Sequence, residues 1–144
     1  MKAVFWISLL AFFGMESVQA GTNAWTRLGQ NGAVTSFAID PQNPANVYAA
    51  TGIGLFKSSD GGENWIALNP GPPCCISTLV MNPQDPATIY GVSGGSGIFR
   101  SADGGATWSA VNFGLPVDVT SLAIDPRNPT TLYSGSAQIG RAHV

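Results

Sequence analysis

The sequence contains few charged residues, one histidine and two cysteines. Charged residues make up 10% of the 144 positions, and six Lys and Arg against eight Asp and Glu give a formal net charge of −2. Binding of nucleic acid by charge needs clustered surplus positive charge, so we expect no nucleic-acid partner. The cysteines are adjacent, and neither a CxxC motif nor zinc-type spacing occurs. We therefore expect no metal site and no cofactor.

Long helices are also not expected, because turn-forming residues are frequent. The chain has 18 glycines and 10 prolines. Disorder is not expected either, since 44% apolar and 10% aromatic residues can bury a substantial core. This balance favours a globular all-β fold built from short strands and tight turns.

The first 20 residues have the pattern of a secretory signal peptide. Lys2 is followed by an apolar run over residues 3–15, and Val18-Gln19-Ala20 offers small residues where a signal peptidase cleaves. The alternative is a membrane anchor, but about 13 apolar residues cover only about two-thirds of a 30 Å hydrocarbon core. We predict cleavage after Ala20, no membrane span in the mature chain, and a secreted or periplasmic location.

The mature chain repeats one unit nearly three times. The segment Phe37–Pro44 recurs as Leu79–Pro86 and as Leu122–Pro129, at spacings of 42 and 43 residues. A second segment, Leu55–Trp65, recurs 43 residues later as Ile98–Trp108. Such matches at one period indicate a repeat architecture.

Each unit contains four short apolar runs separated by turn clusters, and each run reads as a strand. Four strands in about 43 residues are typical of a β-propeller blade. We therefore predict an all-β incomplete β-propeller of two to three four-stranded antiparallel blades, over residues 21–137. The repeats lie near 34–76, 77–119 and 120–137, and the strands expected in the second are Ser77–Met81, Thr88–Val92, Gly97–Ser101 and Thr107–Asn112.

The turn segments resemble the Asp-box, or bacterial neuraminidase (BNR) repeat. The residues that carry this resemblance are Ser58, Asp60, Gly62 and Trp65 in one copy and Ser101, Asp103, Gly105, Thr107 and Trp108 in the other, with Asn64 where the family usually has Thr. The resemblance implies a hairpin between the third and fourth strands of a blade, with structural roles for these residues. Its flanking segments look most like those of sortilin-type receptors, xyloglucanase-type glycoside hydrolases and photosystem II assembly factors.

The pattern is interrupted at both ends. Trp25 aligns with an outer fourth strand that has no preceding inner strands, and the third unit departs from the repeat after residue 137. Residues 138–144 resemble the in-frame translation of a sequencing adapter, so we predict a truncated fragment with a non-native tail, in which His143 has no function. The alternative is a natural terminus in the middle of a blade.

The carboxylates divide between two faces of the predicted propeller. The repeated acids fall in the first-to-second turns and the Asp-box hairpins, where we expect them to cap turns. Asp118 alone falls on the opposite face. Glycoside hydrolysis normally needs two carboxyl groups about 5–9.5 Å apart, so we expect no catalytic residue in this chain.

A ligand surface, if present, is expected on that opposite face. Its candidates are Gln30, Asn31, Cys74, Cys75 and Asp118, beside the loop over residues 91–97. The cysteines could be free thiols, a vicinal disulfide or bonded to a partner, and we expect an exposed loop that folding does not need. The repeated aromatics are expected in the core between blades: Phe37, Tyr48, Phe56, Trp65, Tyr90, Phe99, Trp108 and Tyr133.

These observations favour an exported, non-catalytic β-propeller scaffold that binds protein or carbohydrate. The main alternative is the N-terminal fragment of a secreted xyloglucanase-type glycoside hydrolase, whose catalytic acids lie on other blades. An assembly factor like the photosystem II group is a third possibility. The repeats specify a fold and leave the ligand open.

Overall fold

The computed structural model describes residues 33–68, 75–112, 114, 118–136 and 139–143, the last range by its backbone alone. The predicted signal peptide, Trp25 and three of the predicted ligand-face residues, Gln30, Asn31 and Cys74, lie outside the described residues. Within the part described, no helix is long and apolar enough to cross a membrane.

The described chain folds into strands that form three antiparallel sheets, in agreement with the predicted all-β fold. The first sheet contains β1 (Val34–Ile39), β2 (Val47–Thr51), β3 (Gly54–Ser58) and β4 (Ile66–Leu68). The second contains β5 (Ile76–Met81), β6 (Ile89–Ser93), β7 (Gly97–Ser101) and β8 (Ser109–Ala110). The third contains β9 (Ser121–Ile124), β10 (Thr131–Gly135) and β11 (Ile139–His143).

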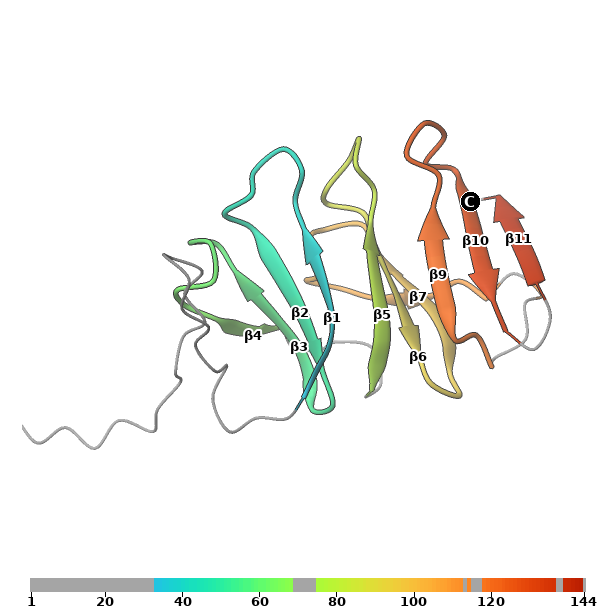
Figure 1. Cartoon of the computed structure of the whole chain (residues 1–144), viewed down its shortest axis with the longest axis horizontal. Helices are drawn as coiled ribbons and strands as arrows, with labels where there is room; N and C mark the ends of the chain where they lie inside the picture. Colours follow the sequence, from blue (N-terminus) through green and yellow to red (C-terminus); the bar gives the residue numbers. More distant parts are fainter. Residues whose placement is uncertain (1–32, 69–74, 113, 115–117, 137–138, 144) are drawn as a thin grey trace, which may run out of the picture.

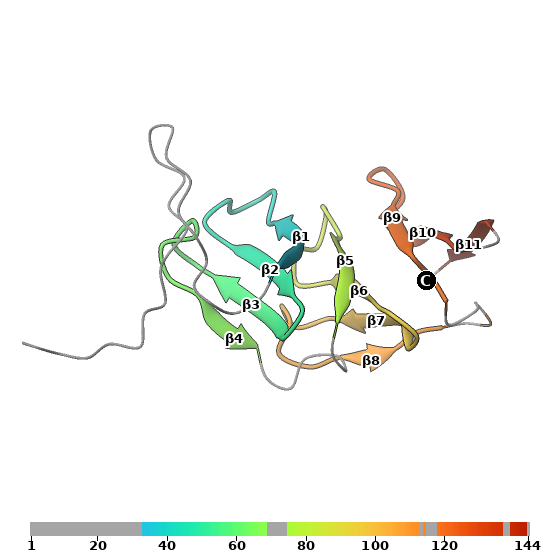
Figure 2. The same ribbon diagram turned by 60° about the horizontal axis from the view of Figure 1, so that its bottom comes forward.

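The three sheets stand side by side, each repeating the course of the one before (Figure 1). Their first strands, β1, β5 and β9, lie along one side of the row, and β4 and β8 lie along the other (Figure 2). Within each sheet, every strand pairs with the next strand along the chain. This is the arrangement of propeller blades, and the described part does not close into a ring.

The core lies between neighbouring sheets rather than within one. One apolar cluster joins the first and second sheets, and a second cluster joins the second and third. The first cluster contains Ala38, Tyr48, Ala50, Leu55, Ile76, Leu79, Met81 and Ile89, and the second contains Tyr90, Val92, Ile98, Val119, Leu122 and Leu132. Each sheet is therefore stabilised chiefly by its neighbours.

Two strands differ from the sequence prediction. The fourth strand of the second sheet is only Ser109–Ala110, because Thr107 and Trp108 belong to the preceding hairpin and bond within it. The segment Ile139–His143, inside the predicted tail, pairs along its length with β10 and takes the place of a third strand. The non-native origin of residues 138–144 stays a prediction.

Two aromatic residues predicted in the core are exposed. Trp65, Tyr48 and Tyr90 are buried as expected and three more are half-buried, but Phe37 is 51% exposed and Tyr133 is 44% exposed. The half-buried residues are Phe56, Phe99 and Trp108. Phe37 lies on the side of the first sheet that faces away from the second sheet, and Tyr133 lies on the side of the third sheet that faces away from the second. The core prediction is wrong for these two residues because their positions need a neighbouring blade.

Candidate functional site

Two hairpins of the same design connect the third and fourth strands of the first and second sheets. We call them the serine–aspartate hairpins, residues 58–65 and 101–108. In the second, Ser101 Oγ accepts a hydrogen bond from Gly105 N at 2.8 Å and donates to Asp103 Oδ1 at 2.8 Å. Asp103 accepts from Thr107 N at 2.8 Å and from the Thr107 hydroxyl at 2.5 Å. The serine and aspartate thus close the turn from inside.

The first hairpin reaches the same geometry with a different residue. Asn64, at the position of Thr107, donates from its backbone N to Asp60 Oδ1 at 2.9 Å and from Nδ2 to Asp60 Oδ2 at 2.7 Å. Trp65 Nε1 donates to Gly62 O at 3.0 Å, as Trp108 Nε1 donates to Gly105 O at 3.1 Å. The departure of Asn64 from the Asp-box pattern therefore leaves the turn unchanged.

The hydrogen bonds hold the hairpin aspartates in their ionised form. The backbone N and side-chain amide of Asn64 lower the pKa of Asp60 to about 2 from an ordinary value of 3.8. The hydroxyl and backbone N of Thr107 lower the pKa of Asp103 likewise to about 2. Because both carboxyls are ionised at neutral pH, neither is suited to donate a proton as a general acid.

The acids of the first-to-second connections are also used in turns. Asp40 Oδ1 accepts from Gln42 N at 2.8 Å, and the side chain of Asn46 helps to lower the pKa of Asp40. Asp85 accepts from the Thr88 hydroxyl at 2.7 Å, and Asp125 accepts from Arg127 N at 2.9 Å. These acids therefore have a structural explanation in the loops that they cap.

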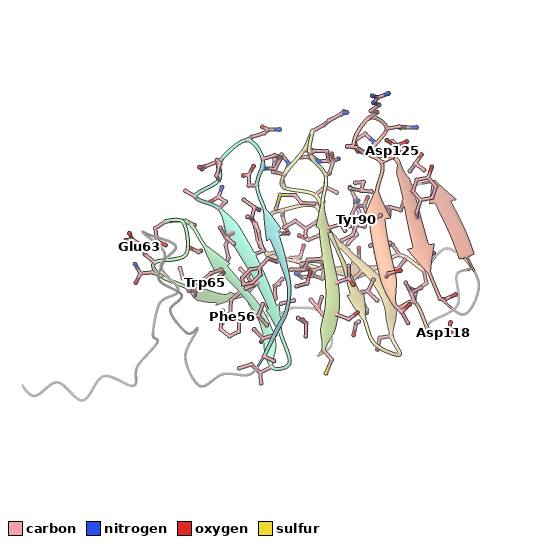
Figure 3. All side chains as sticks on the ribbon, viewed as in Figure 1. Phe56, Glu63, Trp65, Tyr90, Asp118 and Asp125 are labelled. Carbon is pink, nitrogen blue, oxygen red and sulfur yellow. The ribbon has the colours of Figure 1, made fainter. Side chains whose placement is uncertain are left out.

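Asp118 lies at the other end of the blades. Figure 3 shows Asp118 beyond the start of β9 and Asp125 beyond its end. Because strands alternate in direction, all the other carboxylates of the described residues belong to the Asp125 end. Asp118 is exposed in a turn, next to buried Val119.

Cys75 is the second predicted ligand-face residue that the structure describes. It is exposed, with a backbone φ of 66°, and precedes β5. Its carbonyl accepts from Gly94 N at 3.4 Å, so the cysteine segment and the predicted glycine-rich loop meet at one end of the second sheet. Asp118 belongs to the same end of the third sheet (Figure 3).

A groove of about 360 Å³, which the sequence did not predict, lies between the second and third sheets. It lies at the end of the sheets opposite Cys75 and Asp118. The groove is lined by the loop after β5, by the outer part of the second sheet and by the loop between β9 and β10. The Nε atom of Arg100 is buried there and has no hydrogen-bond partner among the described residues. The sequence gives one sign of this groove residue: Arg100 aligns with Lys57, so both repeats have a basic residue at this position.

Metal ligation finds no support in the part of the chain that the structure describes. No group of three or more His, Cys, Asp or Glu side chains lies close enough there to hold an ion. The described acids are instead distributed among separate turns, where backbone and hydroxyl donors engage several of them.

Comparisons with known proteins give structural matches alone, since no family model and no curated protein matches the sequence. An ancestral GH74 enzyme matches with a TM-score of 0.66 at 22% identity, over 78% of this chain and 17% of that chain. The GH74 xyloglucanase from Xanthomonas campestris matches with a TM-score of 0.61 at 22% identity, over 81% of this chain and 18% of that chain. The extracellular domain of a hybrid two-component system from B. thetaiotaomicron matches with a TM-score of 0.61 at 16% identity, over 81% of this chain and 18% of that chain.

These matches and the three repeated sheets decide the fold. The chain is an incomplete β-propeller. At such identities the likeness concerns the fold alone, and the chain spans less than a fifth of the length of these three structures. We refer to the three sheets as blades 1, 2 and 3 from here on.

Proposed function

We propose that this chain is an exported, non-catalytic propeller scaffold that binds a protein or carbohydrate partner. The observation that carries the proposal is the use of the repeated carboxylates. Five of these carboxylates accept hydrogen bonds within the turns they occupy: Asp40, Asp60, Asp85, Asp103 and Asp125. Repetition of these acids is thus explained by folding, without a substrate.

Asp118, at the end of the blades where we expect a ligand, does not form a hydrolytic site with the other described residues. Retaining and inverting glycosidases use two carboxyl groups on either side of the bond that breaks. Asp118 stands at that end, while the other described acids belong to the opposite end of the blades. This separation supports binding rather than hydrolysis.

The proposed partner surface is the end of the blades that carries Cys75, Asp118 and the loop around Gly94. Gln30, Asn31 and Cys74 are assigned to it by the repeat pattern. The proposed location is secreted or periplasmic, which the signal-like N-terminus and the likeness to an extracellular domain support. We propose that the two serine–aspartate hairpins are Asp-boxes, a role their repeat position supports.

The experiment compares hydrolysis with binding on the same polysaccharide. Purified protein is incubated with xyloglucan, reducing ends are measured, and retention is followed by affinity gel electrophoresis. We expect no release of reducing ends above a heat-treated control. Hydrolysis that is lost in Asp118→Asn would overturn the non-catalytic proposal.

The matched control for that variant is Asp125→Asn. It makes the same chemical change at the opposite end of blade 3, where the second repeat already has Asn82. Asn82 Oδ1 accepts from Gln84 N at 2.9 Å, as Asp125 accepts from Arg127 N, so the turn should tolerate the change. Retention by xyloglucan or by a protein partner should respond to Asp118→Asn and not to Asp125→Asn.

A second candidate is a part of a secreted xyloglucanase-type hydrolase. The likeness to two GH74 enzymes favours it, although both are 22% identical to this chain. In that case the catalytic acids belong to blades other than those described. Mass spectrometry of the intact gene product from culture medium would distinguish the two, because the hydrolase requires a much longer chain that releases reducing ends from xyloglucan.

A further inference from the structure

The groove between blades 2 and 3 corresponds to a position that is filled between blades 1 and 2. There, the serine–aspartate hairpin of blade 2 rests on the outer part of blade 1. The Tyr48 hydroxyl donates to Gly104 O at 3.1 Å, and a Cβ at Gly105 would lie only 2.7 Å from Leu68 Cδ1. Lys57 Nζ lies 5.2 Å from the centre of the Tyr48 ring. Blade 1 thus offers the next hairpin a hydroxyl, a cation and an apolar surface.

Blade 2 presents the same three groups to the groove. Tyr90 stands at the repeat position of Tyr48, Arg100 at that of Lys57, and Val111 at that of Leu68. All three line the groove. In the described part of blade 3, β9, β10 and β11 are present and no serine–aspartate hairpin covers them.

Blade 3 contributes the remaining contact point. In blade 2, the hairpin is tied to its own blade by Gly104 N, which donates to Ala87 O at 2.9 Å. Thr130 stands at the repeat position of Ala87 and lines the groove. The groove therefore has a hydrogen-bond donor from blade 2 and a backbone acceptor from blade 3, placed as in the filled interface.

We propose that this groove is a binding site for a β-hairpin with the sequence pattern Ser-x-Asp-Gly-Gly-x-Thr-Trp. The Tyr90 hydroxyl donates to the carbonyl of the residue after the hairpin aspartate, and the backbone N of that residue donates to Thr130 O. Arg100 lines the groove at the repeat position of Lys57 and provides a positive charge to the hairpin. The strand that follows the hairpin adds to the edge of β11 that pairs with no described strand.

The two glycines explain why a hairpin suits the groove. Gly104 and Gly105 have φ values of 68° and 92°, which side chains rarely adopt. Without a Cβ, the backbone at Gly105 comes into direct contact with Leu68. A hairpin of the same pattern can approach Val111 equally closely.

The test uses a fluorescein-labelled peptide of residues 101–112 and the full chain. Fluorescence anisotropy should show saturable binding, and the peptide should raise the melting temperature of the protein. Peptides with Gly105→Ala or Asp103→Ala should bind at least about tenfold more weakly, because the first clashes and the second cannot close the turn.

Variants of the protein locate the site. Tyr90→Phe should weaken peptide binding roughly fivefold by removing one hydrogen bond, and Arg100→Met should do so by a similar or larger factor. Tyr133→Phe is the matched control, since it removes the same hydroxyl from the next repeat position, outside the groove, and should leave binding unchanged. Near-UV circular dichroism confirms that each variant is folded.

Two results would overturn the proposal. In the first, the peptide shows no saturable binding and leaves the melting temperature unchanged, although the protein has a native near-UV spectrum. The other is binding that Tyr90→Phe and Arg100→Met leave unchanged. Displacement of bound peptide by a xyloglucan oligosaccharide, with no discrimination among the three peptides, would assign the groove to sugar instead.

Discussion

Blades 1 and 2 place apolar residues at matching repeat positions, yet they bury them to different extents. Phe37 and Ile39 on β1 are 51% and 58% exposed, whereas Leu79 and Met81 on β5 are 5% and 9% exposed. The difference comes from the neighbour, because β5 packs against blade 1 while no described sheet covers the same side of β1. The repeat therefore encodes a surface, and the adjoining blade determines whether it becomes core.

The serine–aspartate hairpins behave in the opposite way. Ser58 and Ser101 are each 1% exposed, and each makes the same bonds to its own aspartate and glycine. These contacts lie within one blade, so a missing neighbour does not change them. Comparison of the two blades thus separates stability made inside a blade from stability made between blades.

The largest expected difference between the blades is at the core position of the first strand. Leu79→Ala should lower the free energy of unfolding by about 2–5 kcal/mol, because it opens a cavity between blades. Phe37→Ala should cost under about 1 kcal/mol, since that ring is half exposed and its centre lies 6.4 Å from that of Trp65. Urea denaturation followed by tryptophan fluorescence measures both, and equal costs would contradict the comparison.

The hairpin serines should show no such difference. Ser58→Ala and Ser101→Ala should each cost about 1–3 kcal/mol, because each leaves a buried glycine N–H without its acceptor. The same denaturation measurement applies to both variants. A cost found in only one of them would show that the hairpin depends on the adjoining blade.

The hydroxyls of Tyr48 and Tyr90 allow the filled interface between blades 1 and 2 to be compared with the groove between blades 2 and 3. Tyr48→Phe should cost about 1 kcal/mol, since the hydroxyl bonds to Gly104 O in the next blade. Tyr90→Phe should change stability by less than about 0.5 kcal/mol, because its side chain borders the groove instead. Thermal unfolding of the two variants beside the unchanged protein tests this, and the reverse order would be incompatible with an open groove.

The fold could be predicted from the sequence because local signals recur at one period. Strand-forming runs, Asp-Pro turns and the Ser-x-Asp-x-Gly segments each appear in successive units, so the antiparallel sheets and their order followed directly. The exposure of Phe37 and Tyr133 could not be predicted from the repeat alone. It depends on which blades are present, a property of the whole arc rather than of a unit.

The groove could not be predicted for a related reason. Arg100 looks like an ordinary strand residue in the sequence, and nothing there indicates that it lines a groove or that its Nε has no hydrogen-bond partner among the described residues. On the predicted ligand face, Cys75 and Asp118 are both exposed. Sequence periodicity identifies equivalent positions, whereas function depends on how those positions differ.

The smallest expected effect concerns acid, and it should be equal in the two blades. The pKa of Asp60 and that of Asp103 are each lowered from 3.8 to about 2 by hydrogen bonds within their own hairpins. A carboxyl with a lower pKa in the folded state stabilises that state fully above about pH 4, and the contribution is lost as the pH falls toward 2. Asp60→Asn and Asp103→Asn should therefore each flatten the dependence of the urea midpoint on pH in this window, by similar and modest amounts because both groups face solvent. A pH dependence that only Asp103→Asn alters would show that acid acts on the contact between blades 1 and 2, where Gly104 meets Tyr48, rather than on the hairpins themselves.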